Sequence, residues 1–386
     1  NGQNQSCLDQ VFGNGPLDLY AQIIPDLEEI ELTWNYNDIS DEVVGYFIWE
    51  YNNNYNLINQ IESPELFSFT ISGLNSGTFC VSAYDEYQNE SSKACNEASE
   101  FSNYNFTFNE PSSSYLISFP FLSNDNNGIE IIFEPIEEFV EAVISEGVSS
   151  INVDGTWFGG LTDIERKNGY WVMTNDDYSS SNPVHLSVSG IPTALNTVYS
   201  LHDNANLISY IGPDSISVSN ALPDAIEHMF YGIISQGQAA TLIGEEWYGN
   251  LQYFEQGKGY WLMVSDNYSP IDLVWNLDNN LQSNNSVNYK NDQMKPAFEF
   301  NQSTLQSFYF IDRVNAISFD LDQDDVIISY CNDMIVGSRY YGTGYPDVPA
   351  MGYDGKNTSD YCSESNTPDF KIYDSETDRL INLYGN

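Results

Sequence analysis

The chain has 386 residues, of which 56 are acidic and 11 basic, so its formal net charge at pH 7 is −45. This balance excludes nucleic acids and anionic membranes as partners, because binding phosphate groups needs a basic surface. Aromatic residues make up 15% of the sequence, which indicates a folded acidic protein rather than a disordered one. No apolar run is long enough to span a membrane, which argues against membrane insertion, and the length predicts three or four domains.

Residues 14–102 follow an N-terminal tail of residues 1–13 and predict a β-sandwich, because apolar residues alternate with polar ones in several short runs. These runs are Ile30, Leu32 and Trp34; Val44, Tyr46 and Ile48; and Phe67, Phe69 and Ile71.

The segment from Gly73 to Tyr84 (GLNSGTFCVSAY) resembles the E-to-F corner of a fibronectin type III domain, and Trp34 stands where that family keeps its strand-B tryptophan. The resemblance implies a spacer or adhesive unit. The sequence has Phe79 and Cys80 where the family has its corner tyrosine, so a Cys80–Cys95 link between strands F and G is expected to take over the role of the corner hydrogen bond.

Residues 112–192 and 203–278 read as two tandem repeats. Trp157 and Trp247 are 90 positions apart, and so are Trp171 and Trp261, each of which stands in a Gly-Tyr-Trp motif. Several matches at one offset indicate a duplicated domain. The repeats resemble modules of large secreted bacterial proteins that carry fibronectin-like and type IX secretion sorting domains, a likeness that implies no chemistry.

Each repeat is predicted to be a small α+β unit with one helix on a sheet. Residues 135–146 place Ile136, Phe139, Val140, Val143 and Ile144 on one helical face, with a glycine at position 147 to cap it. Residues 223–237 repeat this pattern. Two strands are expected next in the first repeat, at about residues 151–158 and 169–174.

An Asn- and Ser-rich linker, residues 279–296, leads to a C-terminal β-domain of residues 297–386. Strands are predicted at residues 308–311, 326–330, 334–338 and 370–373, with a glycine-rich loop at residues 342–355. This part resembles a C-terminal β-module of secreted marine-type bacterial proteins. The predicted fold class is therefore mainly β: a fibronectin type III-like sandwich, two tandem α+β repeats, and a C-terminal β-sandwich-like domain.

The cysteines indicate an oxidising compartment. Cys80 and Cys95 lie close together in one predicted domain and Cys331 and Cys362 in another, which predicts two local disulfides and an extracellular or cell-surface location. Cys7 is left over, and it either caps the first domain or pairs with another chain.

The densest acidic run is the candidate metal site. Asp320, Asp322, Asp324 and Asp325 precede a predicted strand, and carboxylate oxygens are the ligands that Ca²⁺ prefers. Asp333 and Asp354 would join them if strand ends and loops converge at one end of the sandwich. The spacing is not that of an EF-hand. The alternative is a solvated strand edge in a very acidic protein. Calcium is the only cofactor that the sequence suggests.

Aromatic residues offer a candidate binding surface. Tyr340, Tyr341 and Tyr345 lie in or beside the glycine-rich loop, where side chains are placed to bind a ligand such as a surface glycan. The repeated tryptophans are expected to be core residues instead, because aromatic side chains supply the largest buried areas.

Catalysis finds no support in the sequence. The three histidines are scattered, and neither a G-x-S-x-G motif nor a phosphate loop occurs. The sequence therefore predicts a non-enzymatic extracellular structural or adhesive protein, a cell-surface or filament-forming subunit that assembles head to tail. The alternative is the non-catalytic, carbohydrate-binding portion of a secreted hydrolase.

Overall fold

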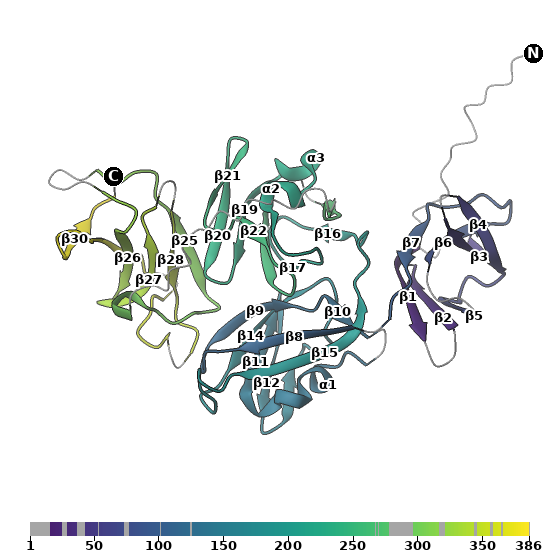
Figure 1. Ribbon diagram of the computed structural model, residues 1–386, viewed down its shortest axis with the longest axis horizontal. Helices are drawn as coiled ribbons and strands as arrows, with labels where there is room; N and C mark the ends of the chain where they lie inside the picture. Colours follow the sequence, from purple (N-terminus) through teal and green to yellow (C-terminus); the bar gives the residue numbers. More distant parts are fainter. Residues whose placement is uncertain are drawn as a thin grey trace, which may run out of the picture. The chain divides into compact units, whose positions relative to one another are not determined.

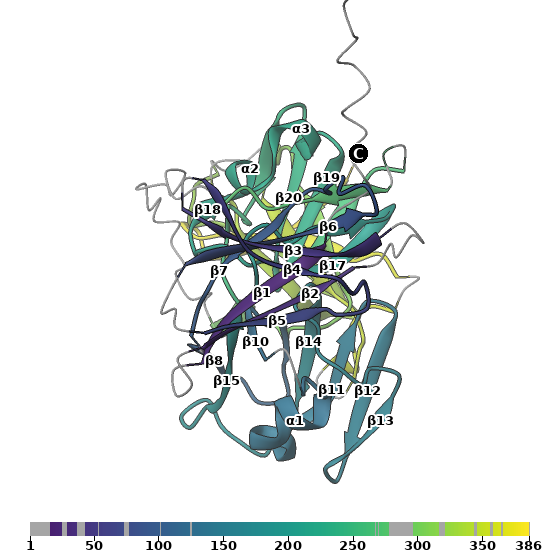
Figure 2. The same ribbon diagram turned by 90° about the vertical axis from the view of Figure 1, so that its right-hand side faces the viewer.

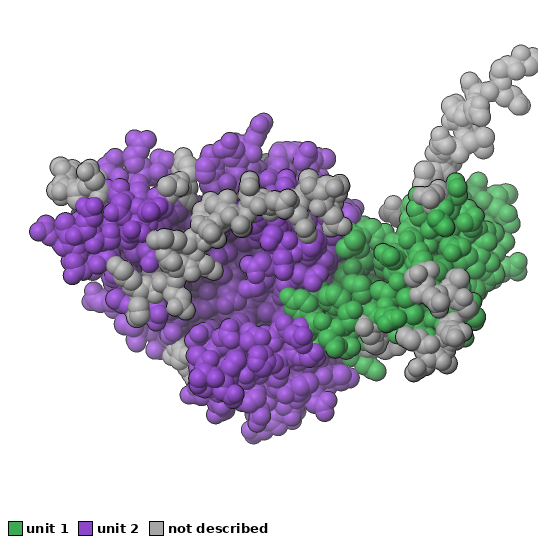
Figure 3. Space-filling view, viewed as in Figure 1, with its two compact units in different colours: residues 1–104, 120–126, 188–199 green, residues 105–119, 127–187, 200–386 purple. Residues whose placement is uncertain are grey.

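The computed structural model describes residues 16–24, 29–36, 43–52, 54–72, 77–100, 102–123, 126–266, 268, 270–277, 296–315, 321–342, 346–355, 358–363 and 366–385. The chain divides into two compact units, coloured separately in Figure 3. Unit 1 comprises residues 1–104, 120–126 and 188–199, and unit 2 comprises residues 105–119, 127–187 and 200–386. Strands dominate both, which confirms the predicted mainly β class. No helix of the described ranges is long and apolar enough to cross a membrane.

Unit 1 contains a β-sandwich of a three-stranded sheet, in the order β1-β2-β5, and a four-stranded sheet, in the order β4-β3-β6-β7 (Figure 2). The strands are β1 (Leu17–Ile24), β2 (Glu29–Asn35), β3 (Val43–Tyr51), β4 (Tyr55–Ile61), β5 (Ser68–Ser72), β6 (Thr78–Asp85) and β7 (Ala94–Glu97). Alternate residues of β2 and β3 point inward, so Leu32, Trp34, Tyr46 and Ile48 share one buried core. The predicted sandwich is confirmed.

The first five-stranded sheet of unit 2 has the order β13-β12-β11-β14-β9; Figure 1 labels these strands except β13, which is labelled in Figure 2. Its strands are β9 (Ser114–Ser118), β11 (Val140–Ser145), β12 (Val148–Val153), β13 (Thr156–Gly159) and β14 (Gly169–Thr174). All four pairings are antiparallel. Strand β14 has the predicted bounds and is buried along almost its whole length.

The second five-stranded sheet has the order β17-β23-β19-β20-β21, the same pattern as the first read from its other edge. Its strands are β17 (Asn204–Ser209), β19 (Phe230–Ser235), β20 (Gln238–Ile243), β21 (Glu246–Gly249) and β23 (Gly259–Val264). The registers also correspond: Ile144 pairs with Trp171 in the first sheet, and Ile234 pairs with Trp261 in the second. Both pairs are shifted by 90 positions from one sheet to the other.

The predicted helix of each repeat is wrong over most of its length. Residues 129–139 form α1 (Ile129–Phe133) and a 3-10 turn η2 (Glu134–Phe139), and β11 begins at Val140. In the second repeat α2 (Val218–Ala221) and α3 (Asp224–Glu227) precede β19. In β11 the adjacent residues Ala142 and Val143 are both buried, and in β19 Ile233 is buried beside the half-buried Ile234, so apolar residues on both faces imitate helical spacing. β-branched residues such as Val143 and Ile233 favour the strand.

A tight turn divides the strand that was predicted at residues 151–158. Asp154 and Gly155 have φ values of 51° and 80°, the left-handed region that a two-residue type I′ hairpin requires. The turn folds β13 back on β12, with Val153 opposite Thr156. Gly147, with φ of 69°, likewise closes the two-residue turn between β11 and β12 instead of capping a helix.

The C-terminal module, residues 296–385, has a four-stranded sheet in the order β27-β26-β29-β30 and a pair, β25-β28. Its elements are η4 (Pro296–Phe298), β25 (Gln306–Phe310), β26 (Val326–Cys331), β27 (Met334–Tyr340), β28 (Asp347–Met351), β29 (Asp369–Asp374) and β30 (Arg379–Leu383). The four predicted strands are present. The predicted glycine-rich loop is corrected, because β28 runs through it and is fully buried against β25.

The remaining strands belong to small sheets of two or three strands. They are β8 (Ser102–Phe108), β10 (Phe121–Leu122), β15 (Val184–Pro192), β16 (Tyr199–Leu201), β18 (Ile216–Ser217), β22 (Tyr253–Phe254) and β24 (Ile271–Leu273). The predicted tail of residues 1–13, Cys7 and residues 279–295 of the predicted linker lie outside the described residues.

Candidate functional site

The two five-stranded sheets bind each other through matching groups. The Leu116 N–H donates to Gln236 Oε1 at 3.1 Å, and the Leu207 N–H donates to Glu146 Oε2 at 2.8 Å. Leu116 and Leu207 lie in the edge strands β9 and β17, while Glu146 and Gln236 lie in the turns after β11 and β19. Each sheet therefore holds the edge strand of the other with the same turn position, an approximate two-fold arrangement.

Backbone groups extend this reciprocal contact. The Ser118 N–H donates to the Gly257 carbonyl at 2.8 Å, and the Ser209 N–H donates to the Lys167 carbonyl at 2.9 Å. An edge strand normally exposes a row of unpaired N–H and C=O groups. Here β9 and β17 end against the loop of the opposite sheet, so part of each edge is satisfied inside the chain.

The centre of this contact is apolar and closely packed. Its side chains are Leu116, Ile144, Trp171, Leu207 and Trp261. Glycine is required at position 259, because a Cβ there would lie 2.9 Å from the Ile117 carbonyl oxygen, and a Cβ on Gly169 would displace the Leu207 side chain, whose Cδ1 would lie 2.7 Å away. The glycines of both Gly-Tyr-Trp motifs thus allow close approach of the sheets.

The tryptophans expected in the core pack inside unit 2. Trp171 is buried, and Trp261 is half-buried against the same cluster. The Trp157 ring lies 5.8 Å from that of Phe133, and Trp247 Nε1 donates to Glu227 Oε1 at 2.7 Å. Two of these rings therefore form the contact between the sheets, and the other two pack within their own sheet segments.

A histidine completes the charged part of the contact. His202 Nε2 lies 2.6 Å from Glu146 Oε1, so the Glu146 carboxylate binds both this ring and the Leu207 amide. The pKa of His202 is raised above its ordinary value of 6.5, first by the hydrogen bond to the Asp203 carbonyl and then by Glu146.

The stability of unit 2 is expected to fall slightly as the pH rises through neutrality. Because the folded state raises the pKa of His202, its contribution is complete below about pH 6.5 and is lost as the pH rises through the raised pKa. The side chain is 61% exposed, so solvent screening limits the effect to at most about 1 kcal/mol. Free energies of unfolding from about pH 6 to about pH 8 should converge for wild type and His202→Gln. His185→Gln is the control, and a pH slope unchanged in His202→Gln would contradict the assignment.

A buried carboxylate joins the second sheet to the C-terminal module. Asp347, at the start of β28, has no exposed side-chain surface. Its Oδ2 accepts the Ala239 N–H at 2.8 Å, and its Oδ1 accepts the Asn250 N–H at 3.1 Å. Arg339 Nε lies 3.2 Å from Asp347 Oδ1, and Arg339 Nη2 donates to the Gly237 carbonyl at 2.6 Å. One ion pair thus satisfies three backbone groups of the β19–β21 region.

The charge state of this pair follows from its surroundings. Burial raises the pKa of Asp347, while the Arg339 guanidinium and the amides of Ala239 and Asn250 partly offset that rise. Hydrogen bonds to an ionised partner are stronger than neutral ones, so this pair holds the backbone groups of Gly237, Ala239 and Asn250 in defined positions.

The acidic run that was predicted to bind Ca²⁺ caps its own turn. Asp325 Oδ2 accepts the Asp322 N–H at 3.0 Å, and Asp325 Oδ1 accepts the Ser375 N–H at 2.9 Å. Asp322 Oδ1 accepts the Asp324 N–H at 2.7 Å. Asp320 lies outside the described residues. Much of the carboxylate capacity for a cation is therefore already engaged with backbone amides.

Two further carboxylates, Asp333 and Asp354, belong to the predicted metal site. Asp325 and Asp333 lie at opposite ends of β26, a separation of roughly 20 Å at about 3.3 Å per residue. Asp354 accepts the Thr304 N–H and the Thr358 hydroxyl. Within the described ranges no group of three or more His, Cys, Asp or Glu side chains is placed to hold a metal ion. Asp333 therefore lies away from the run, and Ca²⁺ binding by these carboxylates stays a prediction.

The predicted binding tyrosines are separated in the structure. Tyr340 packs against the cluster of Phe298, Val326 and Ile328, whereas Tyr341 packs against that of Ile327, Val348 and Ile372. Both are half-buried, and Tyr345 lies outside the described residues. Tyr340 and Tyr341 therefore do not present one shared surface, and ligand binding by the three stays a prediction.

Both predicted disulfides are present. Cys80 and Cys95 face each other across β6 and β7, and Cys331 is bonded to Cys362. The first lies within the sandwich of unit 1, and the second links the end of β26 to the loop after β28.

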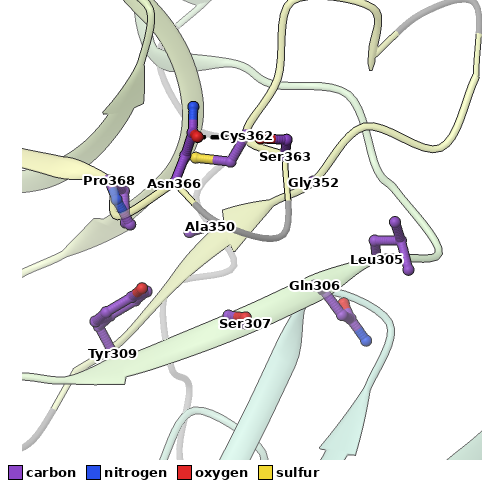
Figure 4. Close-up of a pocket in the computed structure, with 10 residues that line it drawn as sticks. All are labelled: Leu305, Gln306, Ser307, Tyr309, Ala350, Gly352, Cys362, Ser363, Asn366 and Pro368. Atoms are coloured by element: carbon purple, nitrogen blue, oxygen red, sulfur yellow. Dashed lines mark hydrogen bonds between the residues drawn. The ribbon is translucent and has the colours of Figure 1, made fainter.

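A pocket of about 280 Å³ lies beside the second disulfide (Figure 4). Ser307, Tyr309 and Asn366 are among the residues that line it. The Tyr309 ring is fixed edge-on to Phe370 at 5.0 Å, and Gln306 is already bound to the Ser235 carbonyl. Among the described residues that line it there is no aspartate, glutamate, histidine or lysine, so its polar groups are hydroxyls and amides that can form hydrogen bonds to a ligand.

The residues that make the two joints were not found from the sequence. The side chains that make these contacts bind mainly backbone groups: Glu146 and Gln236 between the two sheets, and Arg339 and Asp347 between the second sheet and the C-terminal module. Four of the backbone groups that they bind lie 61 to 120 residues away in the sequence. A backbone partner leaves no trace in residue type. The one available signal was the shared position of Glu146 and Gln236 before the two glycines of the repeats.

No protein-family model matches the chain, and no curated protein does. Among solved structures the chain is similar to an Fn3-like protein from Clostridium thermocellum, with 20% identity over 22% of this chain and 91% of that one and a TM-score of 0.19. It is also similar to Chitinase ChiA74 from Bacillus thuringiensis, with 13% identity over 50% of this chain and 28% of that one and a TM-score of 0.19. For the FN1–FN3 domains of chicken CNTN1 the identity is 14% over 68% of this chain and 98% of that one, with a TM-score of 0.18. At these scores no property is transferred from them.

Proposed function

We propose that the chain is an extracellular structural or adhesive protein whose two repeats and C-terminal module act as one scaffold. The observation that carries this proposal is the pair of joints inside unit 2. Glu146 and Gln236 bind the edge strands across the first joint, and Asp347 binds two backbone amides across the second. Side chains that bind backbone groups of the next module fix its position, which suits a load-bearing spacer.

Several features support a location outside the cell. Two disulfides suit an oxidising compartment, and a net charge of −45 suits a protein kept soluble in salty surroundings. The shared strand order and the 90-residue offset support duplication of one ancestral unit. The proposal includes that unit 1 is a fibronectin type III-like domain and that the protein is secreted by a type IX route.

The location can be tested on protein taken from the cells that make it. Four cysteines should resist alkylation until the sample is reduced, and antibodies against the folded protein should label intact cells. Rapid alkylation of Cys80, Cys95, Cys331 and Cys362 without reductant, together with unlabelled intact cells, would contradict an extracellular role.

Head-to-tail self-assembly and Ca²⁺ binding are parts of the proposal that depend on residues outside the described ranges, namely the tail with Cys7 and Asp320. Sedimentation of the purified chain at high salt, with and without Ca²⁺, tests both. Growth of the sedimenting species on adding Ca²⁺ supports them, and an unchanged monomer under all conditions removes the filament version.

A second candidate, the carbohydrate-binding portion of a secreted hydrolase, is favoured by the pocket of Figure 4, which combines the Tyr309 ring with polar groups. Loss of glycan binding in Tyr309→Ala would support this candidate.

A further inference from the structure

Five aromatic rings form a continuous row on the outer face of the four-stranded sheet in unit 1. In order they are Tyr84, Phe47, Trp49, Tyr55 and Tyr51, with centroid separations of 4.4, 5.8, 6.4 and 4.9 Å between neighbours. The first two rings are buried. Tyr51 and Tyr55 at the other end are 42% and 49% exposed.

The register of two strands creates the row. Tyr46 and Ile48 of β3 point into the core, so Phe47, Trp49 and Tyr51 point outward. A β-bulge between Ile48 and Trp49 shifts the pairing with β4, so that Trp49 lies opposite Leu57 and Tyr51 lies opposite Tyr55. A one-residue shift moves side chains to the other face of a strand, and this bulge therefore places Tyr55 and Leu57 beside the outward rings.

Polar contacts fix the exposed end. Trp49 Nε1 donates to Ser82 Oγ at 2.9 Å, Ser82 donates to Glu90, and Glu90 pairs with Lys93. The Lys93 ammonium lies 4.5 Å from the centroid of Trp49 and 5.0 Å from that of Tyr55. Rings held in this way lose little conformational freedom when a ligand binds, which lowers the entropic cost of binding.

We propose that the exposed end of this row, Trp49, Tyr51, Tyr55 and Leu57 with Lys93 at its side, binds a neutral polysaccharide. This deepens the adhesive function proposed above by naming its ligand class. The apolar C–H faces of successive sugar rings can lie on successive aromatic rings, while Lys93 and Glu90 offer a donor and an acceptor to the hydroxyl groups.

The charge of the chain decides against an acidic glycan. Lys93 is paired with Glu90 and adds no net positive charge to the site, and the chain as a whole carries −45. The size of the row decides against a protein partner. A stable protein interface uses about 20–30 residues on each side, whereas the exposed end offers three rings and one leucine.

Affinity electrophoresis of the full chain tests the proposal, with a panel of neutral and acidic polysaccharides in native gels. At least one neutral polysaccharide should retard the wild-type chain. Tyr51→Ala and Tyr55→Ala should each bind it about tenfold more weakly, a loss of about 1.4 kcal/mol. Tyr87→Ala removes a tyrosine of the same unit that is 78% exposed and outside the row, and should bind like wild type. Circular dichroism confirms that each variant folds.

Four outcomes would overturn the proposal: no retardation by any neutral polysaccharide, retardation by acidic ones only, equal binding by the row variants and Tyr87→Ala, or loss of binding in Tyr309→Ala alone. If the row variants bind every glycan as the wild type does but no longer self-associate in the ultracentrifuge, the row is a protein contact instead. Surface labelling and cysteine alkylation report the extracellular function separately, so failure of that function leaves this test intact.

Discussion

Replacing Asp347 with alanine is expected to lower the free energy of unfolding by about 3–5 kcal/mol, the range for breaking a buried ion pair from one side. The change leaves the Arg339 guanidinium, whose side chain is 15% exposed, without its carboxylate. It also removes the acceptor of the Ala239 and Asn250 amides. Denaturant titration measures the loss, and hydrogen exchange should speed up at those two amides.

Two matched variants sharpen this test. Asp360→Ala removes an exposed aspartate of the same module and should change stability by no more than about 0.5 kcal/mol. The double variant Asp347→Leu with Arg339→Met removes both charges and should recover part of the loss, because no unpaired buried charge remains. An Asp347→Ala protein as stable as Asp360→Ala would show that the module is not held by this carboxylate.

Trp171→Ala is expected to cost about 3–5 kcal/mol as well, because it leaves a cavity at the centre of the contact between the two sheets. Trp171 is 2% exposed and packs with Leu116 and Leu207. Its buried indole N–H has no hydrogen-bond partner among the described residues, so Trp171→Phe should cost clearly less than Trp171→Ala. Thermal and denaturant unfolding of both variants measure this difference.

Phe158→Ala serves as the control for Trp171, because the Phe158 side chain lies on the same sheet but is 56% exposed. Its effect should stay within about 0.5 kcal/mol. If Trp171→Ala were no more destabilising than Phe158→Ala, the ring would be free for another role, such as stacking on a ligand.

The strands were predictable wherever local pattern decided the outcome. Strand β14 and the alternation of Leu32, Trp34, Tyr46 and Ile48 could be read directly, because one period dominates a short run. The predicted helix over residues 135–146 was wrong because adjacent residues of β11, Ala142 and Val143, are both buried, so its apolar residues do not follow the two-residue period of a half-buried strand. The turn at Asp154 and Gly155 did carry a local signal, an Asp-Gly pair between two apolar runs.

The sites were less predictable than the strands. The disulfides followed from cysteine spacing alone. The aromatic row depends on the bulge between Ile48 and Trp49, and a bulge shifts register without a distinct residue type to mark it. The Asp347 contact depends on backbone amides of a different module, and the 56 acidic residues of the chain hide the one carboxylate that is buried there.

The contact between the two sheets also limits how further modules can have been added to this protein by duplication. Leu116 and Leu207 bind equivalent turns of the opposite sheet, so each sheet uses the same surface to contact the other. A contact that uses the same surface on both sides closes when two sheets have met, and neither sheet then has that surface free to bind a third. A further duplication would therefore not lengthen the molecule into a solenoid, and any extra module has to attach by unrelated means, as the Asp347-bearing module does.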